Sequence, residues 1–404
     1  MRRLNSIHII RLAVLLLHLL SMAYLVKGFH HLILDPGGAI DFQQRWVEQR
    51  FILKGKNPAE FTQWHHALQE GKSLPREVRQ EILDTGIRFV SPAVYPPWAY
   101  VTALPLMWPD HFTVGRWYYA LTQLVLILLL AVRLYVLAKP AGLEASLLLV
   151  ASLLAVSSLC STLGVGQYGI VVLAALVGAE WLDRNNHPVG AGLLLGCSLV
   201  KVTLAAPFLL IPLIQKHRFS LLVAAAFVLT SSLLVCWWIQ TPFETMMRQV
   251  KDSAASYADM GYGPLDLALN AGIDPERALL LTAGLGISVT FVLLIVWQKA
   301  NTLTQAAIAA VAARSWTYHN LYDNVIVALL LLAIAAAAHR HHSKTAWIMF
   351  GLIGLSLWAP ARLTQYDWFI QYQFAIWFVG LVFLLWLDRP WKHKKLPAHE
   401  ATGT

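Results

Sequence analysis

The chain has 404 residues, of which 57% are hydrophobic and only 13% are charged. Soluble domains carry about 25% charged residues, so this composition excludes a soluble globular fold. The net charge is +9, from 31 basic and 22 acidic residues, and the basic residues lie in short clusters beside long apolar runs. This placement is typical of a membrane protein, and we expect no nucleic-acid partner.

Long apolar runs recur along the whole chain. A helix needs about 20 apolar residues to cross a hydrocarbon core about 30 Å thick, and inside lipid every backbone polar group must be paired within the element. The runs are rich in Leu and Ala and do not alternate, which excludes a barrel. We therefore predict an all-α polytopic membrane protein with about 11–13 transmembrane or re-entrant helices. The predicted spans are 8–27, 94–109, 116–137, 143–163, 168–182, 188–214, 219–239, 278–298, 303–316, 321–338, 345–360 and 370–387.

The basic clusters predict the orientation, because cytoplasmic loops carry an excess of Lys and Arg. The clusters are Arg2-Arg3, 216–218, 339–344 and 391–395. With a cytoplasmic N-terminus, all of them fall inside. The segment 28–93 and a second loop, 240–277, are then extracytoplasmic. We predict one integral membrane domain over 1–390, in the cell membrane, and a basic cytoplasmic tail over 391–404.

Two layouts remain open between residues 94 and 214. Simple counting places Gln167 inside and Asp183-Arg184 outside, against the charge rule. If 94–109 is instead re-entrant and 188–214 is a broken hairpin, the charges fit and Gln167 faces outside. Interrupted helices of this kind are tolerated where they line a cavity. The residues that would interrupt the hairpin are Lys201, Pro207 and Pro212.

The segment 28–93 is too rich in charged and aromatic residues to be a simple spacer. Residues 42–53 and 75–86 have the apolar spacing of amphipathic helices, and the second is bounded by Pro75 and Gly86. We expect both helices to lie on the outer membrane surface.

Asp41 is the first residue suited to chemistry, in a chain that shows no soluble-enzyme motif and no metal-ligand spacing of Cys and His. It follows Gly37-Gly38 shortly after the first span, and the glycines allow a tight return towards the membrane surface. Its carboxylate is therefore able to point into a cavity between helices. The alternative is a helix N-cap, because Asp41 also precedes an amphipathic stretch.

Lys201 is flanked by apolar residues within a predicted span. A cation in that position needs an anion, and a lipid phosphate is a natural one. The alternative is a lysine that snorkels from the end of a span.

His319 lies in a polar, aromatic cluster that joins two apolar runs and includes Tyr318 and Asp323. An interfacial aromatic belt explains the aromatic residues of this cluster but not the histidine or the aspartate. Gln167, which precedes another apolar run, is a weaker candidate of the same kind.

Several stretches, in this order, resemble glycosyltransferase family 87, whose members are polyprenol-phosphate-mannose-dependent enzymes with the GT-C membrane fold. The similar stretches are Asp41-Phe42, Gly55 to Pro58, Tyr95-Pro96-Pro97, Gly166-Gln167, Gly190 to Lys201 and Pro207, and Ser315 to His319. The last one departs from the usual family pattern, which has Ser-Pro and a tryptophan before the histidine. The resemblance covers about residues 10–340, and the departure bears on the sugar and the acceptor.

The resemblance implies an inverting transfer of one sugar, mannose or a similar hexose, from a polyprenyl-phosphate donor to an extracytoplasmic glycolipid or glycan. Asp41 would be the general base, and Lys201 with His319 would bind the donor phosphate. No metal ion or other cofactor is expected. The substrate-binding candidates are Gln44, Arg45, Tyr95, Gln167, Tyr318 and Asp323.

A transporter or flippase of a polar lipid or solute is the competing interpretation. It would explain the buried Lys201 and the broken helices. It does not explain the charge-rich segment that directly follows the first span.

Overall fold

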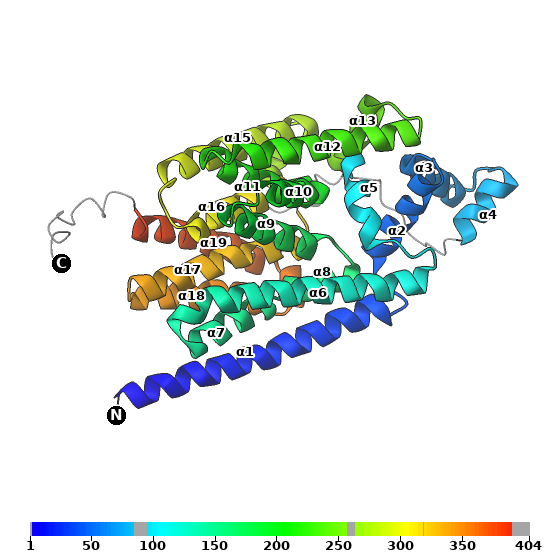
Figure 1. The fold of residues 1–404 in the computed structure, drawn as a ribbon. Coiled ribbons are helices and arrows are strands. Elements are labelled where there is room, and N and C mark those ends of the chain that lie inside the picture. The colour runs from blue at the N-terminus through cyan, green and yellow to red at the C-terminus, as the bar shows by residue number, and fades with distance from the viewer. Residues whose placement is uncertain (1, 85–94, 257–262, 318, 390–404) are drawn as a thin grey trace.

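The computed structural model describes residues 2–84, 95–256, 263–317 and 319–389, and within these ranges it contains helices and no strands (Figure 1). The first half contains α1 (Arg2–Ile33), α2 (Ile40–Leu53), α3 (Pro58–Gln69), α4 (Arg76–Asp84), α5 (Pro97–Ala103), η1 (Leu104–Leu106), α6 (Phe112–Ala138), η2 (Lys139–Ala141), α7 (Leu143–Leu154), α8 (Ser157–Val165) and α9 (Gly169–Arg184). The second half contains α10 (Pro188–Ser198), η3 (Leu199–Lys201), α11 (Val202–Ile214), α12 (Arg218–Trp238), α13 (Phe243–Ser256), α14 (Pro264–Asn270), α15 (Pro275–Val296), α16 (Thr302–Ser315), η5 (Leu321–Val327), α17 (Ala328–Arg340), α18 (Lys344–Trp358), η6 (Ala361–Gln365) and α19 (Asp367–Leu387).

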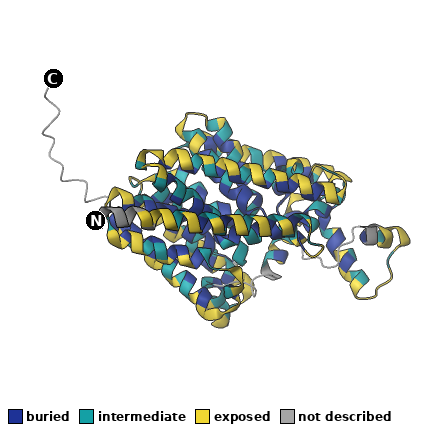
Figure 2. Ribbon diagram, turned by 90° about the horizontal axis from the view of Figure 1, so that it is seen from below, coloured by how far each residue is buried: buried dark blue, intermediate teal, exposed yellow. Residues whose placement is uncertain are grey.

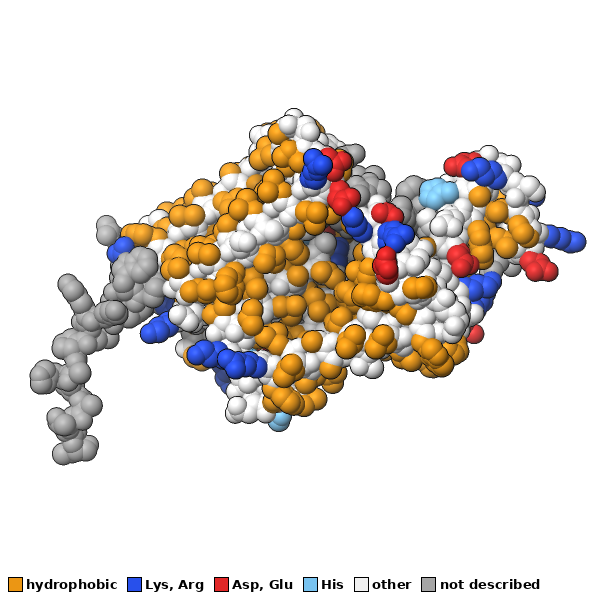
Figure 3. Space-filling view, turned by 90° about the horizontal axis from the view of Figure 1, so that it is seen from above, with side chains coloured by type: hydrophobic (Ala, Val, Ile, Leu, Met, Phe, Trp, Pro, Cys, Tyr) orange, Lys and Arg blue, Asp and Glu red, His pale blue; other side chains and the backbone are white. Residues whose placement is uncertain are grey.

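Seven helical segments of the described chain are long and apolar enough to cross a membrane, or eight when α7 and α8, which meet at a 47° bend, count as one. Large apolar side chains are exposed along their outer faces, and Figure 3 shows hydrophobic atoms covering one flank while charged atoms gather towards its ends. Such a surface is stable only in contact with lipid. The prediction of a polytopic helical membrane protein is confirmed.

The most deeply buried span runs through η5 and α17, where 83% of the residues in its apolar stretch are buried. In α1 only 17% of the residues in the apolar stretch are buried, and Figure 2 shows its outer face exposed. The chain therefore surrounds α17 with other helices, while α1 lies at the periphery.

The two ends of the helical bundle differ in charge. The end where α1 begins and α19 ends, which we call the basic end, also holds the loops after α11 and α17 (Figure 1). Ion pairs tie these connections together there, with His217 Nδ1 3.1 Å from Asp183 and Arg340 2.7 Å from Asp388. The helices α2 to α4 and α13 lie at the opposite end. The predicted grouping of the basic loops on one side is confirmed for the described residues, while the cluster 391–395 lies outside them.

Residues 188–214 form a hairpin, although by length alone they count as one of the seven spans. Both ends of this segment lie at the basic end, because His187 N donates to Leu182 O (2.9 Å) and His217 pairs with Asp183. Its middle reaches the opposite end, where Trp98 Nε1 donates to Leu199 O (2.9 Å). The helix breaks at Lys201, whose φ of −126° and ψ of 85° are not helical. Pro207 and Pro212, which were also expected to interrupt the hairpin, lie inside α11 instead.

Residues 95–109 do not cross the membrane, because α5 has only 7 residues and both sides of it stay at the opposite end. Tyr95 lies 3.1 Å from Gln167, while Trp46 Nε1 donates to Pro109 O at 2.8 Å. The second of the two open layouts, with a re-entrant segment followed by a broken hairpin, is therefore the one that the structure adopts.

The helices expected after the first span are present as α2 and α4, but α2 does not lie on the membrane surface as predicted. Its buried residues include Phe42, Arg45 and Glu48, and it packs between α5, α6 and α8. The prediction failed because the polar side chains of α2 pair with one another, which makes their burial tolerable.

Candidate active site

A sharp turn between α1 and α2 places Asp41. Gly38 passes so close to α1 that a Cβ at this position would lie 1.8 Å from His31 O, so only glycine fits. The next residue, Ala39, is left-handed with φ of 56°, and its N donates to Gly164 O at 2.8 Å. Asp41 consequently lies in the first turn of α2, facing the junction between α8 and α9. The predicted tight return after the glycine pair is confirmed.

The α8–α9 junction approaches the same turn from the other side. Gly166 ends α8 with φ of 78°, and a Cβ there would lie 2.4 Å from Phe42 Cβ. Glycine therefore permits both the left-handed turn and the close contact with α2. This contact brings Gln167, the next residue, against Asp41.

Gln167 forms hydrogen bonds with four residues of the site. Its Nε2 donates to Asp41 Oδ2 at 2.8 Å and lies 3.2 Å from the Tyr322 hydroxyl. Its Oε1 accepts from the Tyr95 hydroxyl at 3.1 Å, and its backbone oxygen accepts from Tyr119 at 3.0 Å. One glutamine thus joins the start of α2 to three other parts of the chain and fixes the direction of the Asp41 carboxylate.

Lys201 and His319 converge on Asp323. The Lys201 Nζ lies 2.5 Å from Asp323 Oδ1 and 4.7 Å from the centre of the Tyr322 ring. His319 Nδ1 lies 3.1 Å from Asp323 Oδ2, and His319 Nε2 is 3.1 Å from the Thr317 hydroxyl. Lys201 therefore already has an anionic partner within the protein.

His319 is almost completely buried, with 1% of its surface exposed. Burial lowers the pKa of His319 to about 4, although the neighbouring Asp323 opposes this shift. At neutral pH the ring is neutral, so it is able to donate one hydrogen bond but does not act as a cation.

Arg45 and Gln44 belong to a second buried group beside the first. Both contact Glu48 Oε1, Arg45 at 2.6 Å and Gln44 at 3.0 Å, and the Arg45 guanidinium lies 4.1 Å from the centre of the Tyr95 ring. Burial alone would lower the pKa of Arg45, but the Glu48 carboxylate raises it well above its ordinary value. Arg45 thus supports Tyr95 and, through it, Gln167.

Asp41 differs from the other acids of the site because it is half-buried and has no ion-pair partner within 4 Å among the described residues. Burial raises the pKa of Asp41, against the nearby Arg45, Gln167 and Lys201, which lower it. A carboxylate with a raised pKa is a stronger base. The helix-cap interpretation is wrong, since Ala39 occupies the N-cap position and α2 has no side-chain cap.

The structure brings most of the predicted site residues together, while Tyr318 lies outside the described residues. Tyr322 and Tyr119 were missed. Tyr322 stands beside Asp323 in the cluster around His319 and was therefore within reach of sequence reasoning, whereas Tyr119 lies in an ordinary apolar run. Its contact with Gln167 depends on how α6 packs against α9.

Comparison with known proteins gives one match. The family model described as Glycosyltransferase family 87 matches residues 93–336, more than half of the chain. This range includes Lys201, Gln167 and His319 but begins after Asp41. No curated protein and no solved structure matches the chain.

Proposed function

The chain belongs to glycosyltransferase family 87, and from this premise we propose that it transfers one hexose, such as mannose, from a polyprenyl-phosphate donor to a hydroxyl of a glycolipid or glycan. Family membership and the helical fold make it a membrane glycosyltransferase, which favours an enzyme over a transporter or flippase. The donor class, the sugar and the residue roles below are parts of the proposal.

Asp41 is the general base of this proposal. The observation that carries it is the Asp41 carboxylate itself, which is half-buried and accepts a hydrogen bond from Gln167. In the part of the chain that the structure describes, it has no ion-pair partner within 4 Å. In a single displacement the acceptor oxygen bonds to the anomeric carbon while its proton passes to Asp41. The bond from that carbon to the phosphate oxygen breaks, and polyprenyl phosphate leaves. Attack from the face opposite the leaving group inverts the anomeric configuration.

Lys201 stabilises the leaving phosphate. The charge that develops on a departing phosphate is best met by fixed cations and hydrogen-bond donors. Lys201 has 12% of its side chain exposed, so its ammonium is able to turn from Asp323 towards a phosphate. His319 assists by holding Asp323 in place. Because these groups supply charge and donors directly, we propose that no metal ion is required.

The active site would face the extracytoplasmic side. It lies at the end opposite the basic loops, and basic loops are retained in the cytoplasm. We propose the cell membrane as the location and place the acceptor on its outer side.

The test is to incubate the purified protein in lipid nanodiscs with a labelled polyprenyl-phosphate sugar and an acceptor mixture. Loss of the lipid-linked sugar, with release of polyprenyl phosphate, supports the proposal. Chelation with EDTA should leave the rate unchanged. In sealed proteoliposomes, movement of the intact donor across the bilayer without chemistry would instead identify a transporter.

A further inference from the structure

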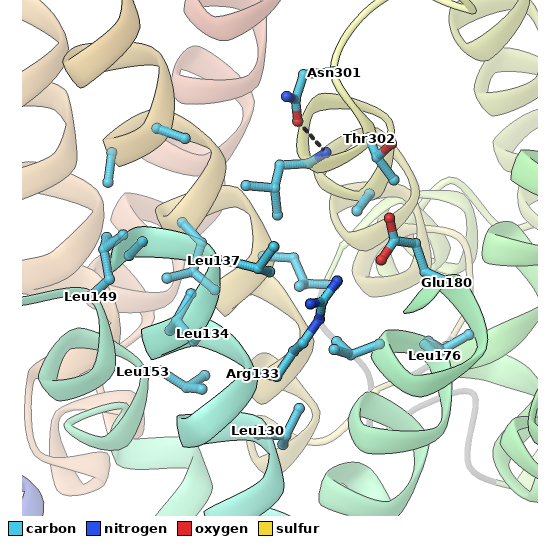
Figure 4. Close-up of a pocket in the computed structure, with 18 of the residues that line it drawn as sticks. Leu130, Arg133, Leu134, Leu137, Leu149, Leu153, Leu176, Glu180, Asn301 and Thr302 are labelled. Atoms are coloured by element: carbon cyan, nitrogen blue, oxygen red, sulfur yellow. Dashed lines mark hydrogen bonds between the residues drawn. The ribbon is translucent and has the colours of Figure 1, made fainter. Parts of the chain in front are cut away.

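A cavity of about 410 Å³ lies near the basic end, between α6, α7, α9, α11, α16 and α17 (Figure 4). None of the candidate active-site residues lines it, so it is a separate feature of the fold. The proposed transfer reaction gives it no role.

The walls of the cavity are mainly apolar. Along α17 the lining runs from Leu329 to Arg340, and along α9 it runs from Leu173 to Arg184. At 1.5 Å per helical residue the cavity is roughly 16 Å deep, about half of a hydrocarbon core of about 30 Å. These dimensions fit a hydrocarbon chain from the membrane leaflet at the basic end.

The polar residues of the lining gather towards the basic end, and all but one of the arginines there have a carboxylate partner. Arg184 pairs with Glu180, and Arg340 lies 2.7 Å from Asp388. Arg133, from α6, makes no hydrogen bond or ion pair in the described chain, and its Nε is buried without a hydrogen-bond partner. Its guanidinium lies 6.0 Å from the centre of the Trp181 ring, a contact that supplies no negative charge. Figure 4 shows its side chain in the middle of the cavity, with Glu180 across from it.

An unpaired arginine in a membrane-spanning helix is costly, and its position calls for an anion. The planar guanidinium matches two oxygens of a phosphate group. A lipid combines that phosphate with a chain suited to the apolar walls.

We propose that this cavity binds an anionic glycerophospholipid from the leaflet at the basic end, with the phosphate on Arg133 and one acyl chain between α6, α9 and α17. The bound lipid fills a gap in the bundle on the side away from the active site. The proposal is independent of the donor and of the transfer reaction.

The test is native mass spectrometry of the full-length protein in detergent, titrated with phosphatidylglycerol or with phosphatidylcholine of identical acyl chains. The wild-type protein should bind phosphatidylglycerol in preference. Arg133→Gln should weaken that binding about tenfold or more, because a hydrogen bond to a charged group contributes about 1.5–3 kcal/mol. Arg133→Lys, which keeps the charge, should retain part of the preference.

Two further variants make the result specific. Ala336→Phe places a ring in the cavity and should weaken binding of both lipids, because it takes the space of the chain. Arg248→Gln is the matched control, since Arg248 is exposed on α13 at the opposite end, and it should bind like wild type. Equal binding of the two lipids by the wild type, or unchanged phosphatidylglycerol binding in folded Arg133→Gln and Ala336→Phe, would overturn the proposal.

Discussion

The Lys201 ammonium lies 2.5 Å from the Asp323 carboxylate, although 122 positions separate the two residues in sequence. The pairing depends on the hairpin of α10 and α11, which carries Lys201 to the end opposite the basic loops. Because of this pairing, Lys201 has an anionic partner before any substrate binds. Binding of a donor phosphate requires the ammonium to be shared with, or moved from, Asp323.

Lys201→Met should abolish tight donor binding. The change also leaves Asp323 buried without its cation, which costs about 3–5 kcal/mol of stability and confuses the interpretation. The double variant Lys201→Met/Asp323→Asn removes both charges and serves as the control. We expect it to recover the unfolding temperature but not the donor affinity, measured by titration in nanodiscs. Recovery of both would show that Lys201 has only a structural role.

Gln167→Glu tests whether Gln167 controls the basicity of Asp41. A second carboxylate 2.8 Å from Asp41 disfavours a second negative charge, so the pKa of Asp41 should rise further. A base works only when deprotonated, and activity is therefore lost as the pH falls through the Asp41 pKa. Because burial already raises that pKa, the acid limb of kcat/KM should lie above the ordinary range of an aspartate in the wild type. It should move to still higher pH in the variant.

A matched control for that experiment is Gln167→Leu. It removes the hydrogen bond to Asp41 without adding charge, so it should lower kcat without the same upward shift of the acid limb. Identical pH profiles for Gln167→Glu and the wild type would mean that another group is the base.

Gly166→Ala should damage both stability and activity. The left-handed backbone costs an alanine about 1–2 kcal/mol, and the new Cβ would also collide with Phe42, 2.4 Å away. Gly272→Ala is the control, because Gly272 has a similar φ of 80° but nothing within 4 Å of the added Cβ. Gly272→Ala should lose only the stability that the left-handed backbone costs an alanine. The difference between the two variants in unfolding temperature and in sugar transfer measures the contact that positions Asp41.

Cysteine labelling in intact cells tests the orientation. Lys72 lies after α3 and Lys344 begins α18, and both are exposed at opposite ends of the bundle. A membrane-impermeant reagent should modify Lys72→Cys and spare Lys344→Cys until the cells are opened. Modification of both from outside would contradict the assignment of the basic end to the cytoplasm.

The sequence predicted the helical class and the grouping of basic loops, and it singled out most of the residues that the structure brings together around Asp41, because hydropathy and charge act locally along the chain. It did not predict which side chains form ion pairs or hydrogen bonds with one another. The Lys201–Asp323 pair and the contact of Tyr119 with Gln167 depend on helix packing, which no local pattern encodes. Arg133 was missed because a single arginine hardly changes the hydropathy of the long apolar run in α6. The surface location predicted for α2 was wrong for a related reason. Polar residues that are buried and hydrogen-bonded to one another have the same sequence pattern as polar residues on a solvent-exposed helix face.

Asp41→Asn is the decisive variant for the proposed mechanism. Asparagine keeps the shape of the side chain and an oxygen that accepts from Gln167, but it has no basicity. A general base contributes about 10²–10⁴-fold, so single-turnover sugar transfer should fall by that order while donor affinity and unfolding temperature stay close to wild type. Glu48→Gln is the comparison, because Glu48 is fully buried against Arg45 and its loss should act mainly on stability. Near-normal transfer by Asp41→Asn would remove Asp41 from the chemistry and leave Asp323 as the carboxylate to test next.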